Sequence, residues 1–186
     1  MMKSKALGCL LLAISCSAVA QASKVRPVNL EQMAQRADRI FSGRCIQAKT
    51  QHDEALGRDV SVVVFEVQRA VKGQIGSTIS VRMLAGAHST GTAGFADGEE
   101  VVVFLYGDSS LGLTSPVGLG QGKFKIQRDK LGQRLAVPQW GTDQLFRGLS
   151  DSARARLGPA VDAWKGQRGV DPDALLDMAA TLSIAE

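Results

Sequence analysis

The sequence predicts a mainly β protein with helices only near its two ends. Three apolar runs rich in β-branched residues lie within residues 60–106, and such runs are typical of strands. Glycine-containing segments at 72–76 and 85–98 separate them, as expected between strands of one sheet. Glycine is abundant, at 20 of 186 residues, which favours a core connected by turns. A chain of this length is expected to form one domain besides any leader.

The N-terminus is expected to direct export. Lys3 and Lys5 precede an apolar run that is too short to span a membrane, and A-x-A triplets follow it. This pattern predicts a secretory signal peptide, residues 1–22, cleaved after Ala22, and therefore a periplasmic or secreted protein without a transmembrane segment in the mature chain. The alternative is a lipoprotein anchored through Cys16, although Leu12 lies one residue too far from that cysteine for the usual signal.

Removal of the signal peptide changes both the charge and the cysteine content. Without Lys3 and Lys5, 20 basic residues face 18 acidic ones, so the formal net charge falls from +4 to +2. A charge this small gives no reason to expect nucleic-acid binding. Cys45 remains as a lone cysteine in an oxidising compartment. We expect it to be a small buried side chain on a strand; an intermolecular disulfide or a reactive thiol is the alternative.

The first predicted elements of the mature chain are a two-turn helix and a bent strand. Asn29 and Gln32 match the two ends of a capping box. The strand expected at 40–49 contains Gly43, and a glycine inside a strand usually marks a bulge or a sharp bend. Small barrels use such a bend to curl a first strand across two sheets. A polar hairpin loop is expected at 51–58.

Further strands are predicted at 60–71, 77–84 and 101–106. The last of these is the most apolar and is therefore expected at the centre of the sheet. Long glycine-rich loops, at 85–98 and 107–122, follow the second and third of these strands. We predict the contact surface of the protein on these two loops, because binding residues are often carried by loops on a rigid scaffold.

The end of the chain combines a hairpin with helices. Polar and apolar residues alternate over 123–128, which predicts a strand with Phe124 and Ile126 inward, and 134–137 predicts a return strand. A helix is expected from Ser150 to about residue 165, and another after Asp171, where proline takes the first helical position. The predicted organisation is a β-barrel domain with an N-terminal helix, residues 23–140, and a helical extension, residues 141–186.

Ser109 has a catalytic interpretation as well as a structural one. The apolar strand that runs into Gly107-Asp108-Ser109 resembles the nucleophile turn of GDSL-type lipases and esterases. Such enzymes need a histidine to accept the serine proton, and the two histidines of this chain, His52 and His88, both lie upstream. A simple turn is the favoured interpretation; a hydrolase using Ser109 with one of these histidines is the alternative.

Cofactor and metal motifs are incomplete. The segment 118–123 is glycine-rich, but Val117 and Phe124 replace the Gly and the Ser/Thr that a Walker loop needs. The histidines and cysteines have no spacing typical of a zinc site. The acidic residues within 97–100 favour a solvated hairpin, with a weak calcium contact as the alternative. We expect no cofactor and no metal, and we do not expect an enzyme.

Basic residues on the predicted strands are a further candidate feature. Lys123, Lys125 and Arg128 form a stripe, which Arg82 extends. A charged face exposed to solvent is the favoured interpretation, and a surface for an anionic ligand is the alternative. Together with the two long loops, this stripe gives the candidate binding residues: Arg82, His88, Leu113, Lys123 and Lys125.

Several short motifs carry a resemblance to a known group of proteins. They are A-D-R-I-F-S-G-R at 37–44, F-E-V at 65–67 with V-K-G at 71–73, and G-E-E at 98–100 leading into V-F-L at 103–105. Together they resemble the barrel of netrin-like and tissue-inhibitor-of-metalloproteinase-like modules, especially small secreted bacterial proteins of that type. The resemblance covers about residues 37–128 and implies a small five-stranded OB-like antiparallel barrel.

The resemblance implies protease inhibition only weakly. The animal inhibitors present an N-terminal cysteine to the catalytic zinc and contain many disulfides, whereas the mature N-terminus here is Ser23 or Gln21. We therefore predict an exported, non-enzymatic β-barrel module that binds an extracytoplasmic protein or envelope component through its loops. A protease inhibitor or protease-associated protein is one alternative, and a serine hydrolase is another.

Overall fold

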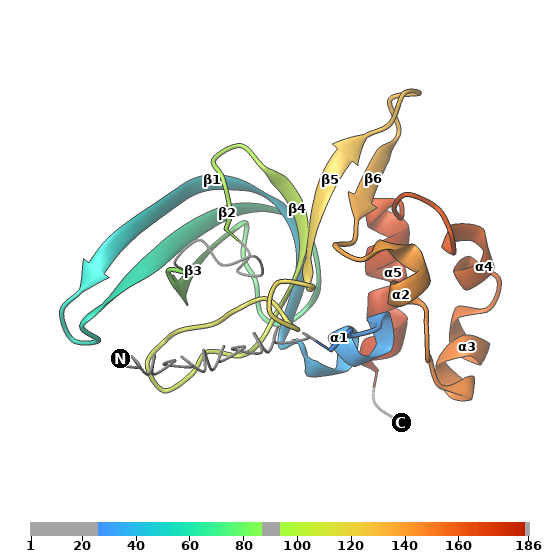
Figure 1. Cartoon of the computed structure of the whole chain (residues 1–186), viewed down its shortest axis with the longest axis horizontal. Helices are drawn as coiled ribbons and strands as arrows, with labels where there is room; N and C mark the ends of the chain where they lie inside the picture. Colours follow the sequence, from blue (N-terminus) through green and yellow to red (C-terminus); the bar gives the residue numbers. More distant parts are fainter. Residues whose placement is uncertain (1–25, 87–93, 185–186) are drawn as a thin grey trace, which may run out of the picture.

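The computed structural model describes residues 26–86 and 94–184, which form one antiparallel sheet and five helices. The strands are β1 (Arg39–Asp53), β2 (Arg58–Lys72), β3 (Thr78–Leu84), β4 (Glu100–Leu105), β5 (Lys123–Arg128) and β6 (Arg134–Val137). The helices are α1 (Leu30–Arg36), α2 (Gly141–Leu145), α3 (Asp151–Leu157), α4 (Ala160–Trp164) and α5 (Pro172–Ser183). The helices gather beside one part of the sheet (Figure 1). The predicted mainly β class is confirmed.

The sheet is open and has six strands in the order β3-β2-β1-β4-β5-β6, so the expected five-stranded closed barrel is not observed. The sixth strand arises because residues 134–137 pair with β5 along their full length. On the open side of the sheet, the loop 107–122 makes the connection that strand pairing would make in a closed barrel. The Thr114 N–H donates to the Arg82 carbonyl on β3 (2.8 Å), and the Tyr106 N–H, directly after β4, donates to Ser115 (3.1 Å).

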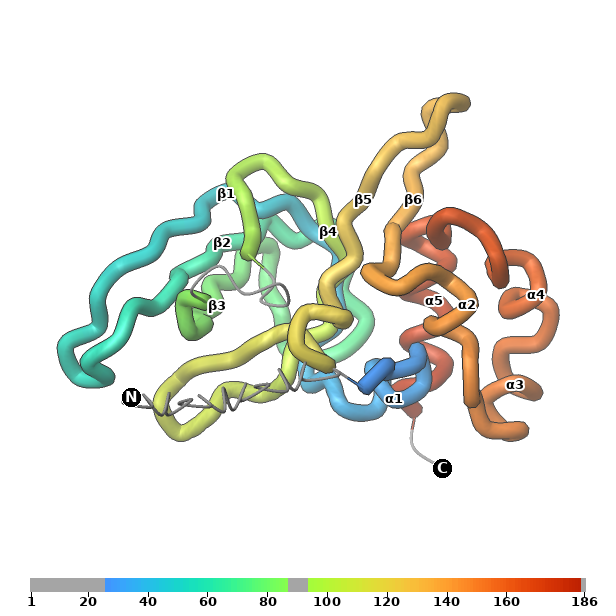
Figure 2. Tube along the Cα trace, in the orientation of Figure 1, coloured from blue at the N-terminus to red at the C-terminus, as the bar shows by residue number. Residues whose placement is uncertain are grey.

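Strands β1 and β2 are long and strongly curved (Figure 2). Their pairing register shifts between Ser42 and Gly43, which confirms the bulge predicted at this glycine. A Cβ atom on Gly43 would lie 2.6 Å from the carbonyl oxygen of Glu66, so the close approach of the two strands requires glycine. Both strands continue beyond their predicted ends, and the connecting loop shortens to residues 54–57, because His52 still pairs with Asp59.

Strand β4 is buried on both faces and separates two apolar clusters. Val102 and Phe104 belong to the cluster on the helix side, whereas Val101, Val103 and Leu105 belong to the cluster inside the curl of β1, β2 and β3. This double burial explains the uninterrupted apolar run, and it confirms the predicted central position. The cluster inside the curl, which we call the curl cluster, consists of Phe41, Cys45, Val63, Phe65, Val81, Met83, Val101, Val103 and Leu105.

The C-terminal helices share the second cluster with the sheet. Leu175, Leu176 and Leu182 on α5 are completely or almost completely buried there. Arg69 on β2 pairs with Asp173 and Asp177 of the same helix. The backbones of Ala136 on β6 and Val170 exchange two hydrogen bonds, of 2.7 and 3.0 Å. The helices therefore cover one face of the sheet.

The starts of α1 and α5 follow the sequence signals. The Asn29 side chain accepts from the Gln32 N–H (2.9 Å), and the Gln32 side chain accepts from the Asn29 N–H (3.3 Å), which completes the capping box. Asp171 accepts from the N–H groups of Asp173 (2.9 Å) and Ala174 (3.0 Å) at the start of α5. No helix within the described residues is long and apolar enough to cross a membrane.

Two features of the helical part differ from the expectation. The single helix expected from Ser150 is instead two helices, because Gly158 ends α3 at a positive φ of 54° and Pro159 precedes α4. Helix α2 was not expected, and it has only five residues and no side-chain cap. Residues 1–22, where a signal peptide is predicted, lie outside the described residues, as do Cys16 and His88.

Candidate binding surface

The loop 107–122 is held firmly at its second half. Val117 is fully buried in the helix-side cluster. The side-chain amide of Gln121 donates to Gly118 (2.8 Å) and to Arg26 (3.0 Å), while its oxygen accepts from the Val28 N–H (2.8 Å). Because Gln121 is itself buried, these bonds fix the loop against the N-terminal end of the described chain.

This firmly held segment presents an exposed leucine in an unfavourable backbone conformation. Leu119 has a φ of 58°, and it is the only described residue other than glycine with a positive φ. This conformation is costly for a residue with a Cβ. Leu119 is 66% exposed, so burial in the core does not compensate for the strain. Hydrogen bonds on either side of it hold the turn, from the Gly122 N–H to Val117 (2.8 Å) and from the Lys123 N–H to Gly120 (3.0 Å).

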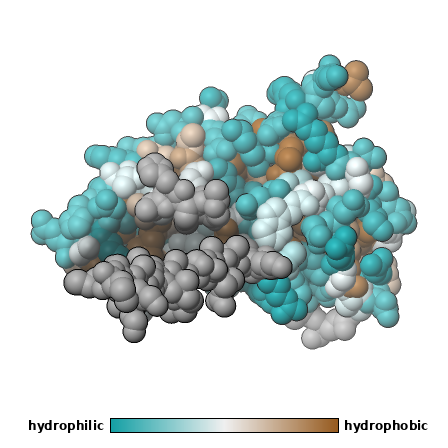
Figure 3. Space-filling view, in the orientation of Figure 1, coloured by the Kyte–Doolittle hydropathy of each residue, from teal (hydrophilic) through white to brown (hydrophobic). Residues whose placement is uncertain are grey.

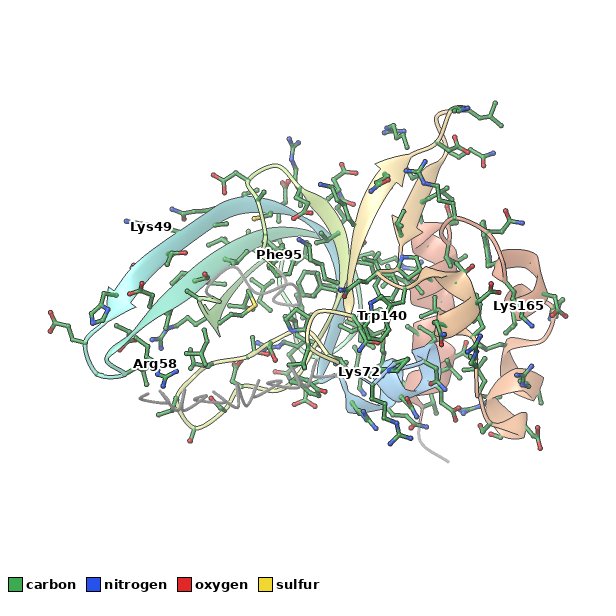
Figure 4. All side chains as sticks on the ribbon, in the orientation of Figure 1. Lys49, Arg58, Lys72, Phe95, Trp140 and Lys165 are labelled. Atoms are coloured by element: carbon green, nitrogen blue, oxygen red, sulfur yellow. The ribbon has the colours of Figure 1, made fainter. Side chains whose placement is uncertain are left out.

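A tryptophan lies against the same part of the loop. Trp140 lines a small cavity together with Gln121 and Val28, and Figure 4 shows it close to this loop and to α1. Its side chain remains partly exposed. Leu119 and Trp140 therefore flank the buried Gln121, one along the chain and the other across the cavity, and we call these two exposed residues the Leu119 surface.

The structure brings two of the predicted binding residues together at the other half of this loop. Leu113 follows Gly112, where a Cβ atom would lie 3.6 Å from the Arg82 guanidinium. Arg82 also pairs with Asp53 on β1, and its backbone accepts from Thr114. Leu111, which is 56% exposed, lies beside them on the loop. The first half of the loop 107–122 and the end of β3 next to it therefore form a second exposed region.

Lys123 and Lys125 lie elsewhere and differ in their roles. The Lys123 ammonium is 2.8 Å from a Glu99 carboxylate oxygen and 4.4 Å from the centre of the Phe95 ring. The side chains of Lys123 and Glu99 are only 13% and 8% exposed, so this pair holds the segment 94–100 on the sheet. Phe95 reaches into the curl (Figure 4) and stacks edge-on against Phe65. Lys125 is 58% exposed and lies 3.6 Å from the same carboxylate.

Cys45 is a core residue of the curl cluster. Its side chain is fully buried, which confirms the favoured interpretation of this cysteine. Burial raises the pKa of the Cys45 thiol, and the nearby carboxylates Asp97 and Glu99 add to the shift. The thiol is therefore protected from solvent and held in its neutral form.

Ser109 is engaged as a turn residue. Its hydroxyl oxygen accepts from the N–H groups of Leu111 (3.4 Å) and Leu113 (3.2 Å). The His52 ring is hydrogen-bonded to Asp59 on the exposed β1–β2 hairpin (2.9 Å). None of the hydrogen bonds found among the described residues joins Ser109 to His52, and His88 lies outside those residues. In the same part of the chain, no group of three or more His, Cys, Asp or Glu side chains is placed to hold a metal ion.

The sequence interpretation selected the loop but missed Leu119 and Trp140. A signal for Leu119 was present, because a leucine between two glycines in a turn has no partner at helical or strand spacing. Trp140 carried no such signal, since its contact with the loop joins segments that are far apart in the chain.

The fold and this surface define a mainly β protein with a helical layer on one face of its sheet and an exposed apolar loop. No known protein family matches the chain, and no curated protein sequence matches it either.

Proposed function

We propose that this protein is an exported, non-enzymatic module that binds a protein of the cell envelope through the Leu119 surface. The observation that carries the proposal is the conformation of Leu119, which is strained, firmly held and exposed. Strain of this kind gathers at binding and catalytic positions, because folding alone selects against it. A binding partner that buries Leu119 gives this side chain a purpose that the fold does not.

The chemistry of the surface favours a protein partner. Exposed apolar side chains on an ordered backbone lose little conformational freedom on binding, which increases affinity. Tryptophan is enriched among the residues that contribute most to protein interfaces. Leu111, at the Arg82 end of the loop, extends the apolar character of this region.

The relation to OB-like, netrin-like barrels remains part of this proposal. Strand β1 pairs with both β2 and β4, and it bends at Gly43. This is the role of a first strand that curls across two halves of a small barrel. The loop 107–122 hydrogen-bonds to Arg82 on β3, the edge strand that a closed barrel would pair with β5.

The experiment is affinity capture from detergent-solubilised envelope and from culture supernatant, using the tagged protein and a Leu119→Gly variant. Glycine accepts a positive φ at no steric cost, so this variant removes the side chain and leaves the turn intact. Deletion of the whole loop is a poorer test, because it also removes the buried Val117 and Gln121. Ile46→Thr on β1, an exposed and β-branched position, is the matched control.

The expected result is a single partner captured by the wild type and by Ile46→Thr, and lost with Leu119→Gly. Equal capture by Leu119→Gly overturns the proposal. A captured protease would be assayed with both variants: inhibition that depends on Leu119 identifies an inhibitor, and capture without inhibition identifies a protease-associated protein.

A further inference from the structure

The β5–β6 hairpin projects beyond the rest of the molecule and ends in an exposed apolar tip (Figures 1 and 3). Leu131 at this tip is 83% exposed, which is the largest exposure among the large apolar side chains described. The tip lies apart from the helices, so a flat surface could meet it without first meeting the body of the protein (Figure 1).

The turn that carries Leu131 is rigid and does not need a leucine. The Asp129 carboxylate accepts from the N–H groups of Leu131 and Gln133, each at 2.8 Å. The backbone of Asp129 accepts from Gly132 (3.1 Å) and donates to Gln133 (2.9 Å). Such turns are stabilised by Asp at the first position and by Gly at a positive φ, here 80° at Gly132. The leucine is therefore not explained by the folding of the hairpin.

The turn that carries Leu131 has an excess of positive charge. Arg128 and Lys130 flank Leu131, and the one carboxylate of the turn, Asp129, accepts hydrogen bonds inside it. The other three cations of the hairpin, Lys123, Lys125 and Arg134, pair with Glu99 or Glu100. Arg128 donates to the Gly132 carbonyl (3.1 Å), which places its guanidinium at the tip. Lys130 is exposed beside Leu131. Arg168 contributes a further cation near the strands, because it donates to the Gln127 side chain (2.6 Å).

We propose that this hairpin docks reversibly on an anionic membrane surface. Leu131 enters the boundary between headgroups and acyl chains, while Arg128 and Lys130 contact lipid phosphates. An apolar side chain combined with basic neighbours is the chemistry that binds such surfaces, and each part alone binds weakly. The basic surroundings of Leu131 favour lipid over an apolar protein pocket, since cations around such a pocket would lose hydration without a fixed partner.

The test is co-sedimentation with vesicles made of equal parts of phosphatidylglycerol and phosphatidylcholine, compared with vesicles of phosphatidylcholine alone. The full chain is produced in its host and purified in the processed form that accumulates there. All variants then share one N-terminus, so differences between them report on the hairpin. Circular dichroism checks that each variant is folded.

The expected result is binding to the anionic vesicles that weakens with added salt. Leu131→Gln should lower the partition coefficient about tenfold, and Lys130→Gln about fivefold. Ile46→Thr on β1, an exposed position outside the hairpin, should bind as the wild type does. The inference is overturned by an absence of binding to anionic vesicles, by equal binding to both kinds of vesicle, or by full binding of Leu131→Gln. Loss of binding in Ile46→Thr would overturn it too, and because partner capture is measured without vesicles, either proposal can fail alone.

Discussion

At Gly43 the absence of a side chain decides how closely β1 and β2 approach. A Cβ atom there would meet the Glu66 carbonyl oxygen at 2.6 Å, so the strands must separate or bend to accommodate alanine. We expect Gly43→Ala to lower the free energy of unfolding by about 1–3 kcal/mol. Urea denaturation measures this, and Gly94→Ala is the control, because nothing lies within 4 Å of a Cβ at that position. Equal effects of the two substitutions would contradict the role given to Gly43.

Unlike Gly43→Ala, Leu119→Gly should not lower the stability of the protein. Glycine removes the strain of the positive φ but increases the flexibility of the unfolded chain, so we expect stability to stay the same or rise by up to about 1 kcal/mol. Leu119→Ala keeps the backbone strain and should not stabilise the protein. Thermal unfolding of the two variants checks this difference. A clear loss of stability in Leu119→Gly would mean that the leucine side chain supports the fold.

The raised pKa of Cys45 predicts a pH dependence of stability. The unfolded chain releases the thiol proton near its ordinary pKa, while the folded protein keeps it to higher pH. This contribution to stability is complete below the ordinary thiol pKa and is lost as the pH rises toward the folded value. Urea denaturation at increasing alkaline pH should therefore show a steeper loss of stability in the wild type than in Cys45→Ala. Parallel curves would contradict the shift.

For single residues, the sequence allowed correct predictions where the role of the residue depends on its neighbours along the chain. Gly43 and Cys45 were interpreted correctly, because a glycine within an apolar strand and a lone cysteine in a strand have local explanations. Leu119 could be noticed but not interpreted, since its strain depends on how Gln121 and Val117 attach the loop to distant residues. The pairing of Lys123 with Glu99 was missed for the same reason.

At the scale of elements, Lys123 and Lys125 on β5 make a matched pair for a test. Removal of Lys123 leaves the buried Glu99 carboxylate with the more distant Lys125 and the Ala96 N–H, so Lys123→Ala should cost about 2–3 kcal/mol of stability. Lys125→Ala removes an exposed partner and should change stability by less than about 0.5 kcal/mol. Urea denaturation of both variants measures the difference. Similar costs would show that the Lys123–Glu99 pair does not hold segment 94–100.

The order of the elements could be predicted, but several of their ends could not. Strand order along the chain follows from apolar runs and turn residues, and α1 and α5 begin at recognisable caps. The extra length of β1 and β2 depends on their mutual pairing, which no single segment shows. The break between α3 and α4 was visible as Gly158-Pro159, but its weight against the apolar pattern was misjudged.

At the scale of the molecule, the shared cluster of helices and sheet predicts a single unfolding transition. Leu176 on α5 is fully buried against elements of both kinds, so Leu176→Ala should cost about 2–4 kcal/mol. Of the two tryptophans, Trp164 lies on α4 and Trp140 directly precedes α2, so their fluorescence reports on the helical part and its contact with the loop 107–122, while circular dichroism also reports on the sheet. Both signals should shift to the same lower urea midpoint. Separate midpoints would mean that residues 141–184 unfold on their own.

The open sheet also illustrates what sequence patterns leave undetermined. The expectation of a closed barrel rested on strand count and on the resemblance of short motifs. Closure depends instead on whether β3 can reach β5, and here a loop lies across β3 first. Whether the sheet closes therefore depends on long-range contacts, which attach residues 107–122 at both of their ends.

An open sheet has two edges with unpaired backbone groups, and such edges can recruit strands from other molecules. Here each edge is occupied at one point by the protein's own chain. The Arg82 carbonyl on β3 is used by Thr114, and Ala136 on β6 is used in both directions by Val170. The same contacts that attach the loop and the C-terminal helices thereby obstruct both edges of the sheet, which protects the molecule from strand-to-strand aggregation.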